Sequence, residues 1–340
     1  MYVKELRYDL PESAIAQQPI EPRDAARMLV TVDTRGPRHA RVRDLADYVE
    51  PGDVLVVNDT KVLPARLLLR KASGGAVEVL LLNPRHDNHI EWEALVRPGR
   101  RVPAGTELFF DDGPAIVSVG ERLDGGGTRA ITLLGVSTAS EVEAVLDRCG
   151  IVPLPPYIHA PLGDPGRYQT VYARDAGSVA APTAGLHLTD SVLERCRSRG
   201  ATVASVTLDV GLGTFRPMTG DRVEDHHMHA ERYVVPRSTA DAIASAGRVI
   251  AIGTTSLRCV EAYAETGELR GETELFIHGD YPFRVVDRLL TNFHLPASSL
   301  LALLDAFMGP RWRDLYGVAL REGYRFLSFG DAMLVDRRVR

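Results

Sequence analysis

The segment SVAAPTAGLHLTD, residues 178–190, places His187 behind a run of small residues at the expected start of a helix. Small side chains let another molecule approach the backbone closely, and proline fixes its own φ. Thr189 and Asp190 can cap the helix that follows. The pattern predicts a binding loop. Its ligand-binding residues are expected to be Pro182, Thr183, Ala184 and Gly185.

A second segment, VIAIGTTSLR at 249–258, is typical of a buried strand, a glycine turn and a helix. This order directs backbone N–H groups and the positive end of the helix outward, which suits a carboxylate or a phosphate. Thr254 could instead cap the helix, and Arg258 could either contact the anion or pair with Glu261. The anion-binding candidates are Gly253, Thr254, Thr255, Ser256 and Arg258.

The densest group of titratable residues is EDHHMHAE at 224–231. In an extended strand His227, His229 and Glu231 would project from one face, which is a possible metal triad. The chain offers no second grouping of ligands, so a metal-free site for proton transfer or hydrogen bonding fits the segment as well. Glu231 is a candidate general base, and the alternative is a surface carboxylate before a strand.

Two further segments carry polar residues where an element ends or begins. LLTNFHLPASSLL at 289–301 places Asn292 and His294 before a proline and an apolar helix, a pair suited to a purine or a ribose. A histidine satisfied within the core is the competing interpretation. VVNDTKVLPAR at 56–66 ends a strand with polar residues that form either a site between domains or a turn. These residues are Asn58, Asp59 and Thr60.

The elements that must position these residues differ along the chain. From about residue 64 to 135, short apolar or alternating runs are separated by Gly, Pro, Asp and Asn, which predicts an antiparallel β module. Outside it strands alternate with helices, which favours a mixed or parallel sheet. We therefore expect an α/β fold with a mixed-sheet body at 1–62 and 151–340. An antiparallel β-barrel-like domain is expected to be inserted at 63–150.

Length and composition bound the class of protein. A chain of 340 residues exceeds the usual size of one hydrophobic core. A net charge of -5 gives no general attraction to nucleic acid, although clusters such as Arg97, Arg100 and Arg101 could bind phosphates. No apolar run reaches the roughly 18 residues of a membrane span, and nothing directs export. Three cysteines without CxxC spacing fit reduced thiols in a cytoplasm.

One motif favours a different enzyme class. VTLDVGLGTF at 206–215 resembles the first motif of Rossmann-type methyltransferases, in which a strand and a glycine turn bind S-adenosylmethionine. Its context does not fit, because Phe215 takes the third glycine position and Arg216-Pro217 interrupts any helix. An S-adenosylmethionine-dependent methyltransferase stays as an alternative function.

Together these segments resemble the S-adenosylmethionine:tRNA ribosyltransferase-isomerases of queuosine biosynthesis. The similarity extends over nearly the whole chain in ordered, loop-centred motifs. They include YDLPESAIAQQPIEPRDAARMLV, PGDVLVVNDTKVLPARL, GSVAAPTAGLHLTD, VGLGTFRP, MHAE, GTTSLR and VVDRLLTNFHLPASSLL. The resemblance implies an α/β body with a separate β domain.

The resemblance also implies a reaction. The family transfers and isomerises the ribosyl group of S-adenosylmethionine onto the 7-aminomethyl-7-deazaguanine base at the tRNA wobble position. Epoxyqueuosine forms, and adenine and methionine leave. The implied partners are tRNA and S-adenosylmethionine, the latter as co-substrate, with no metal and no permanently bound cofactor. We expect a cytoplasmic monomer that does not associate with membranes.

This chemistry suggests roles for the titratable residues. A base must remove a proton from the carbon beside the sulfonium, and the candidates are His187, His229 and Glu231. Adenine leaves more readily when a donor contacts a ring nitrogen, which His294 or Asn292 could supply.

The remaining candidates would bind substrate. The GTTSLR turn with Arg258 suits the methionine carboxylate. The small residues at 180–185 would admit the flipped-out deazaguanine or the adenosine beside the backbone. Arg97 and Arg216 are possible contacts to tRNA phosphates.

Several positions depart from the family pattern. Asp209 stands where a histidine precedes VGLGTF, His278-Gly279-Asp280 replaces Tyr-Pro-Gly, Ala230 replaces a serine, and Asp305 sits where a serine is usual. A carboxylate in place of an imidazole reverses the local charge preference, and an added aspartate would repel a phosphate-rich substrate. Two further alternatives are therefore a paralogue acting on a different acceptor and a non-catalytic RNA-binding member.

Overall fold

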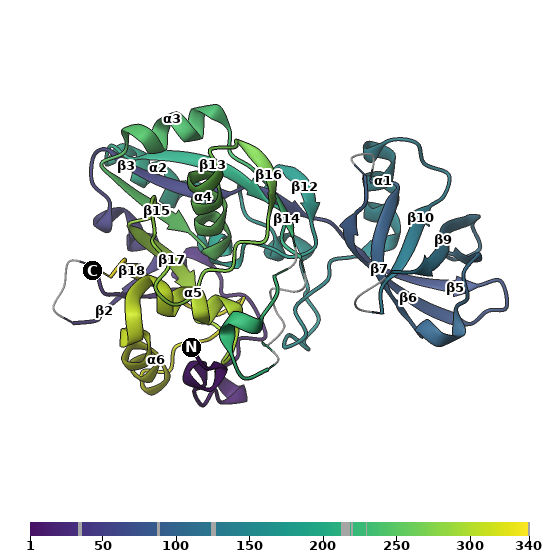
Figure 1. The fold of residues 1–340 in the computed structure, drawn as a ribbon, viewed down its shortest axis with the longest axis horizontal. Coiled ribbons are helices and arrows are strands. Elements are labelled where there is room, and N and C mark those ends of the chain that lie inside the picture. The colour runs from purple at the N-terminus through teal and green to yellow at the C-terminus, as the bar shows by residue number, and fades with distance from the viewer. Residues whose placement is uncertain are drawn as a thin grey trace. The chain divides into compact units, whose positions relative to one another are not determined.

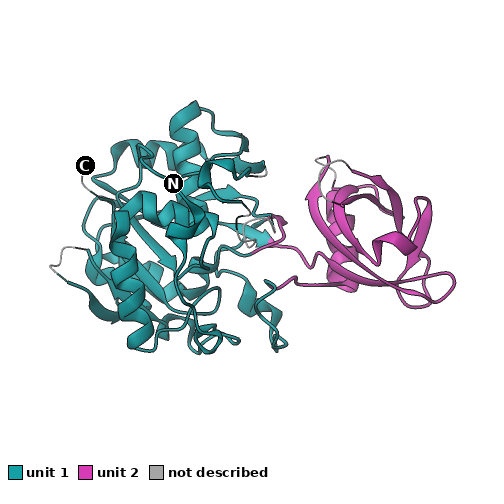
Figure 2. Ribbon diagram, turned by 60° about the horizontal axis from the view of Figure 1, so that its bottom comes forward, with its two compact units in different colours: residues 1–61, 155–175, 181–340 teal, residues 62–154, 176–180 magenta. Residues whose placement is uncertain are grey.

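The computed structural model describes residues 1–32, 36–86, 89–123, 127–211, 218, 220–228 and 230–338. The chain divides into two compact units (Figure 2). Unit 1 comprises residues 1–61, 155–175 and 181–340, and unit 2 comprises 62–154 and 176–180. Compared with the predicted insertion at 63–150, unit 2 also contains residue 62, residues 151–154 and a short return segment.

Unit 2 is a closed antiparallel barrel, because β8 pairs with β5 as well as with β9. Alternate residues of β7 point inward, and Trp92, Ala94 and Val96 are buried. Around the barrel the strands are β5 (Arg66–Lys71), β6 (Ala76–Pro84), β7 (Glu91–Arg97), β10 (Arg129–Leu133), β9 (Ala115–Arg122) and β8 (Thr106–Phe109). The chain then forms α1 (Ala139–Cys149) and β11 (Gly150–Ile151). The predicted inserted β-barrel-like domain is confirmed.

Unit 1 contains a nine-stranded mixed sheet, as predicted (Figure 1). In sheet order the strands are β16 (Arg270–Thr273), β14 (Glu231–Val234), β13 (Thr202–Leu208), β3 (Asp53–Asn58), β15 (Arg248–Ile252), β17 (Arg288–Asn292), β18 (Ala332–Asp336), β1 (Arg27–Val30) and β2 (Arg38–Arg41). A separate pair joins β4 (Thr60–Val62) to β12 (Asp175–Ser178). The central strands β13, β3, β15 and β17 are parallel, so their carboxyl ends meet at one edge.

Helices cover both faces of this sheet. On one face α2 (Asp190–Ser198) and the 3-10 helix η4 (Val42–Tyr48) share a core cluster with Leu55 and Val57 of β3. Thr189 caps α2 as predicted, since its hydroxyl accepts from Val192 N. The other helices are α3 (Arg237–Ser245), α4 (Thr254–Thr266), which crosses the central strands on the other face, α5 (Ser299–Met308) and α6 (Trp312–Arg321).

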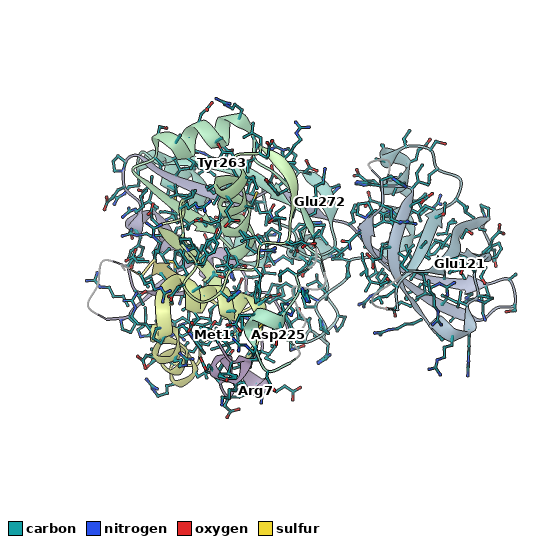
Figure 3. The ribbon with its side chains drawn as sticks, viewed as in Figure 1. Met1, Arg7, Glu121, Asp225, Tyr263 and Glu272 are labelled. Carbon is teal, nitrogen blue, oxygen red and sulfur yellow. The ribbon has the colours of Figure 1, made fainter. Side chains whose placement is uncertain are left out.

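The N-terminal residues pack against a distant segment of unit 1. The N-terminal ammonium forms an ion pair with Glu224, and Val3 N donates to Asp221 O at 2.9 Å. A β-bridge between Tyr2 and Arg222 belongs to the same contact, and Figure 3 shows Met1 near Asp225. Within the described ranges no helix combines the length and the apolar character needed to cross a bilayer.

Candidate active site

A cleft at the carboxyl edge of the parallel strands brings three of the predicted loops together. Its volume is about 360 Å³, a value that includes space open to solvent. The loops come from the start of the 3-10 helix η7 (Thr183–His187), from the β15–α4 turn and from the end of β17. The lining residues are Ala181, Pro182, Thr183, Ala184, Val210, Gly253, Thr254, Thr255, Thr291, Asn292, His294 and Leu300.

The amino end of α4 faces this cleft. Gly253 is the N-cap with φ 89°, and no side chain caps the helix, so Thr254 is the first helical residue and does not take the expected capping role. The buried Thr255 Oγ1 makes no hydrogen bond within the described part of the chain. Ser256 does not line the cleft, since its hydroxyl donates to Ile252 O at 2.8 Å. The turn therefore presents unpaired donors, as an anion site requires.

His294 is the histidine that lines the cleft. Its Nε2 hydrogen-bonds with Thr291 Oγ1 at 3.0 Å. Its backbone is held on both sides, because Tyr8 Oη donates to His294 O and His294 N donates to Tyr316 Oη at 2.8 Å. Burial lowers the pKa of His294 to about 3. The ring is therefore neutral near pH 7 and can hydrogen-bond without carrying charge.

Asn292 connects the cleft to His187. Thr183 Oγ1 donates to Asn292 Oδ1 at 3.0 Å, and Asn292 Nδ2 donates to His187 Nε2 at 3.0 Å. His187 does not line the cleft but a second pocket at the other end of η7. Burial, reinforced by nearby arginines, lowers the pKa of His187 to about 3. Gly185 also lies outside the cleft lining: a Cβ there would meet Tyr172 Oη at 2.1 Å.

Glu231 and Arg258 form a buried ion pair. Glu231 Oε1 also accepts from Gly211 N at 3.2 Å, and Arg258 Nε donates to Leu275 O at 3.1 Å. Glu261, the expected alternative partner of Arg258, instead accepts three backbone N–H groups at 284–286. Neither member of the pair lines the cleft, so each is one step removed from a ligand there.

The histidine segment before Glu231 differs from the predicted extended strand, because β14 begins only at Glu231. His227 is exposed, and His229 lies outside the described residues, as does Arg216. In the described ranges no three His, Cys, Asp or Glu side chains are grouped as metal ligands.

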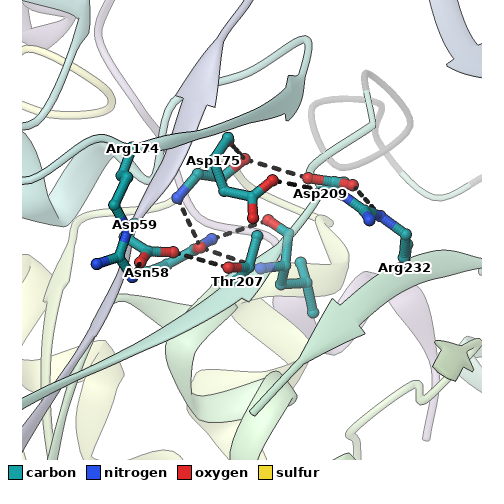
Figure 4. Close-up of polar contacts among 9 residues, drawn as sticks. Asn58, Asp59, Arg174, Asp175, Thr207, Asp209 and Arg232 are labelled. Carbon is teal, nitrogen blue, oxygen red and sulfur yellow. Dashed lines mark hydrogen bonds and ion pairs between the residues drawn. The ribbon is translucent and has the colours of Figure 1, made fainter. Parts of the chain in front are cut away.

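The predicted polar residues at the end of β3 and the start of β4 form a network with internal partners (Figure 4). Asn58 Nδ2 donates to Leu208 O at 2.9 Å, and its Oδ1 accepts from Leu208 N at 3.0 Å. Asp59 accepts from Thr207 Oγ1 at 2.8 Å and from Arg174 Nη2 at 2.6 Å. The network therefore fixes β3 against β13, whose continuation forms the cleft wall at Val210.

Asp209, a departure from the family pattern, belongs to the same network. It accepts from Thr60 Oγ1 at 3.2 Å and from Arg232 Nε at 2.8 Å. Burial raises the pKa of Asp209, while Arg232 opposes that shift. Because its carboxylate is largely buried against these partners, Asp209 presents little negative charge to a ligand.

Two other departures have structural partners. Asp280 pairs with Arg338 at 2.6 Å, and Asp305 accepts from Trp312 Nε1 at 2.7 Å. The His278 ring packs on the Phe276 ring, with 4.7 Å between the ring centroids. Arg97 lies in unit 2, exposed at the end of β7.

Sequence reasoning missed three cleft features. Thr291 and Val210 each lie one residue from a position that was singled out; valine carries no polar group, and Thr291 lies inside an apolar strand, where no local pattern directs its hydroxyl to a site. Tyr8, which holds the His294 backbone, is 286 residues away in sequence, so no local pattern could connect them.

Comparisons with known proteins identify the family of this chain. The family model described as queuosine biosynthesis protein matches residues 3–335. A Rubrobacter xylanophilus protein named S-adenosylmethionine:tRNA ribosyltransferase-isomerase is 49% identical over 98% of each chain. A Moorella thermoacetica protein of the same name is 49% identical over 98% of this chain and 100% of its own.

A solved structure is also similar. The crystal structure of S-adenosylmethionine tRNA ribosyltransferase from Thermotoga maritima is 34% identical in sequence. The match covers 97% of this chain and 99% of that one, with a TM-score of 0.54. The matches therefore extend over nearly the whole chain. The chain belongs to the queuosine biosynthesis protein family.

Proposed function

We propose that this protein transfers and isomerises the ribosyl group of S-adenosylmethionine onto the 7-aminomethyl-7-deazaguanine base at the tRNA wobble position. The products are epoxyqueuosine, adenine and methionine. The observation that carries this proposal is the convergence of the 181–184, 253–255 and 291–294 loops on one cleft in a chain of this family. The protein is proposed to act as a cytoplasmic monomer, with no permanently bound cofactor.

We place the methionine carboxylate of S-adenosylmethionine at the amino end of α4. Support comes from the uncapped backbone N–H groups and from the buried Thr255 hydroxyl, which has no partner among the described residues. A helix of 13 residues also contributes a favourable dipole for an anion. Arg258, behind this turn, is proposed to act through its ion pair with Glu231.

We place adenine beside His294 and Asn292. A neutral imidazole carries one N–H group, which can donate a hydrogen bond to a ring nitrogen of the departing base. Asn292 has its amide oriented by Thr183 and His187, so its position at the cleft wall is fixed before substrate binds.

The base that removes the proton beside the sulfonium is proposed to be one of His187, His229 and Glu231. Glu231 is supported by its buried carboxylate, which accepts from Gly211 N, next to Val210 of the cleft lining. The small side chains at 181–184 are proposed to admit the flipped-out base beside the backbone. Arg97 and Arg216 are proposed contacts to tRNA phosphates.

The test is to incubate the protein with S-adenosylmethionine and tRNA carrying the aminomethyl-deazaguanine, and to follow adenine release and the mass of the nucleoside product. Adenine with epoxyqueuosine supports the proposal. Binding of both substrates without either product contradicts it, and methyl transfer without adenine would instead identify a methyltransferase. That last outcome is disfavoured by the fold, because β13 pairs antiparallel with the next strand, β14, and so does not open a parallel βαβ unit.

A further inference from the structure

A second pocket in unit 1 has been given no ligand above, although one residue of its wall, His187, is a candidate base. It lies at the end of η7 opposite the cleft. Its volume is about 220 Å³, a value that includes space open to solvent. Its wall includes the polar side chains of Arg23, Arg167, His187 and Ser328 and the apolar side chains of Ile20 and Phe329. Two guanidinium groups and one imidazole thus gather on a small concave surface.

Positive charge in this pocket is only partly compensated. Arg23 donates to main-chain carbonyls, with Nη1 at 2.8 Å from Gln169 O and Nη2 at 3.2 Å from Gly166 O. No carboxylate of the described residues forms an ion pair with Arg23. Burial and the neighbouring Arg167 lower the pKa of the Arg23 guanidinium, although the charges of Glu21 and Asp164 oppose that shift. A bound anion would relieve this repulsion.

Among the residues that the structure describes, one exposed carboxylate forms an ion pair with a pocket arginine. Glu21 pairs with Arg167, and the Glu21 side chain is 69% exposed. A third cation lies close by, because Arg325 Nη1 donates to Gln18 O at 3.1 Å, beside Pro19 of the pocket wall. The buried Arg325 Nη2 has no hydrogen-bond partner among the residues that the structure describes.

His187 adds a neutral donor to the same pocket. Its Nε2 accepts from the Asn292 amide, so the proton of the neutral ring lies on Nδ1. The orientation of Asn292 is fixed independently, because its Oδ1 accepts from Thr183 and its Nδ2 also donates to Leu327 O at 3.2 Å. Within the described part of the chain, His187 Nδ1 donates to no other residue.

We propose that this pocket binds one backbone phosphate of the tRNA, next to the nucleotide whose base enters the cleft. Two guanidiniums and an N–H donor match the charge and the several acceptors of a phosphodiester. Asn292 lines the cleft, His187 lines the pocket, and the two side chains are hydrogen-bonded at 3.0 Å, so adjacent parts of one nucleic acid could occupy both. The assignment rests on the proposed function, because it takes tRNA as the substrate.

A pair of substitutions with opposite expected effects tests the site. Arg167→Gln removes a cation and is expected to raise the Kd for tRNA about tenfold, with the slope of log K against log salt shallower by about 0.7–0.9. Glu21→Gln removes the competing carboxylate and is expected to lower that Kd about threefold. The exposed Glu21 gives a test that does not depend on how well the arginine variant folds.

Matched controls come from α2. Glu194 and Arg197 form an exposed ion pair at 3.4 Å, and Glu194→Gln and Arg197→Gln are expected to leave the Kd for tRNA within about twofold. Kd values for S-adenosylmethionine are measured on all four variants and are expected to stay unchanged. Effects on S-adenosylmethionine alone would make its carboxylate the occupant and overturn the proposal, as would equal effects of the pocket and control pairs.

Binding is measured without turnover, so this test is separate from that of the proposed function. If the wild type releases no adenine but the pocket variants change tRNA affinity as expected, the phosphate site stands and the reaction assignment fails. If adenine is released and the pocket variants do not change tRNA affinity, the reaction stands and the phosphate site fails.

Discussion

His187 and His294 are both neutral in the folded protein, which has a consequence for stability in acid. Burial lowers the pKa of each from 6.5 to about 3. Between these pH values the unfolded chain binds protons that the folded chain does not. The free energy of unfolding therefore falls as the pH falls through this window, by up to about 1.4 kcal/mol per pH unit for each histidine.

Urea unfolding at pH 7, 5.5 and 4.5 measures this dependence. His294→Gln is expected to be less sensitive to acid than the wild type, because it lacks one of the two groups. His39→Gln is the control, since His39 is exposed. A pH dependence equal in the wild type and the His294 variant would contradict the prediction.

His294→Gln is also expected to lower kcat for adenine release by about 100-fold or more, the usual contribution of a positioned donor. The Kd for S-adenosylmethionine should change much less, because the carboxylate is proposed to bind at α4. His39→Gln should retain full turnover. Near-normal turnover of the His294 variant would remove His294 from the reaction.

Local sequence chemistry located most of the cleft residues but not the partners of the charged ones. Gly253, Asn292 and His294 were predicted from turn and proline patterns, which are properties of adjacent residues. The partner of Arg258 could not be found in this way, because Glu231 is 27 residues away and is brought close only by the packing of α4 on the sheet. His187 lines the second pocket and not the cleft, and this orientation likewise depends on how η7 packs.

At the level of elements, α4 allows backbone strain to be separated from ligand binding. Both of its flanking glycines have positive φ, 89° for Gly253 and 75° for Gly267. An alanine should destabilise the protein by about 1–2 kcal/mol at Gly267, which is left-handed, and by up to about 3 kcal/mol at Gly253, whose φ and ψ (89° and 154°) essentially only glycine adopts. Only Gly253 lines the cleft, where an added Cβ would lie 3.6 Å from Ala184 Cβ.

Gly253→Ala is therefore expected to raise the Kd for S-adenosylmethionine about tenfold, whereas Gly267→Ala should leave it unchanged. Thermal unfolding and titration calorimetry on both variants check the two effects separately. Equal Kd values for the two variants would show that the amino end of α4 does not bind the substrate.

Element types were more predictable than their boundaries. Short apolar runs separated by turn residues identified the barrel, because each strand carries its own period-two pattern. The metal-triad interpretation required an extended strand at 227–231, but β14 begins at Glu231, where its pairing with β16 begins. Strand ends are set by partners from elsewhere in the chain, which local patterns do not contain.

For the whole molecule, the question is how a chain with a net charge of -5 would bind a polyanion. Overall charge disfavours the encounter, so affinity must come from local groups of cations. The pocket with Arg23 and Arg167 is one such group in unit 1. Arg97, with Arg100 and Arg101 in the following 3-10 helix, is a second group, carried by unit 2.

If unit 2 contributes to tRNA binding, Arg97→Glu should raise the Kd for tRNA about tenfold at low salt and reduce the magnitude of the salt slope by about 1. The Kd for S-adenosylmethionine should not change, because that substrate is proposed to bind within unit 1. Arg148→Glu, an exposed arginine on α1 of the same unit, is the matched control for a general charge effect. Filter binding at several salt concentrations distinguishes the two variants. Equal losses would mean that only net charge matters, whereas a loss confined to Arg97 would place the nucleic acid on that side of the barrel.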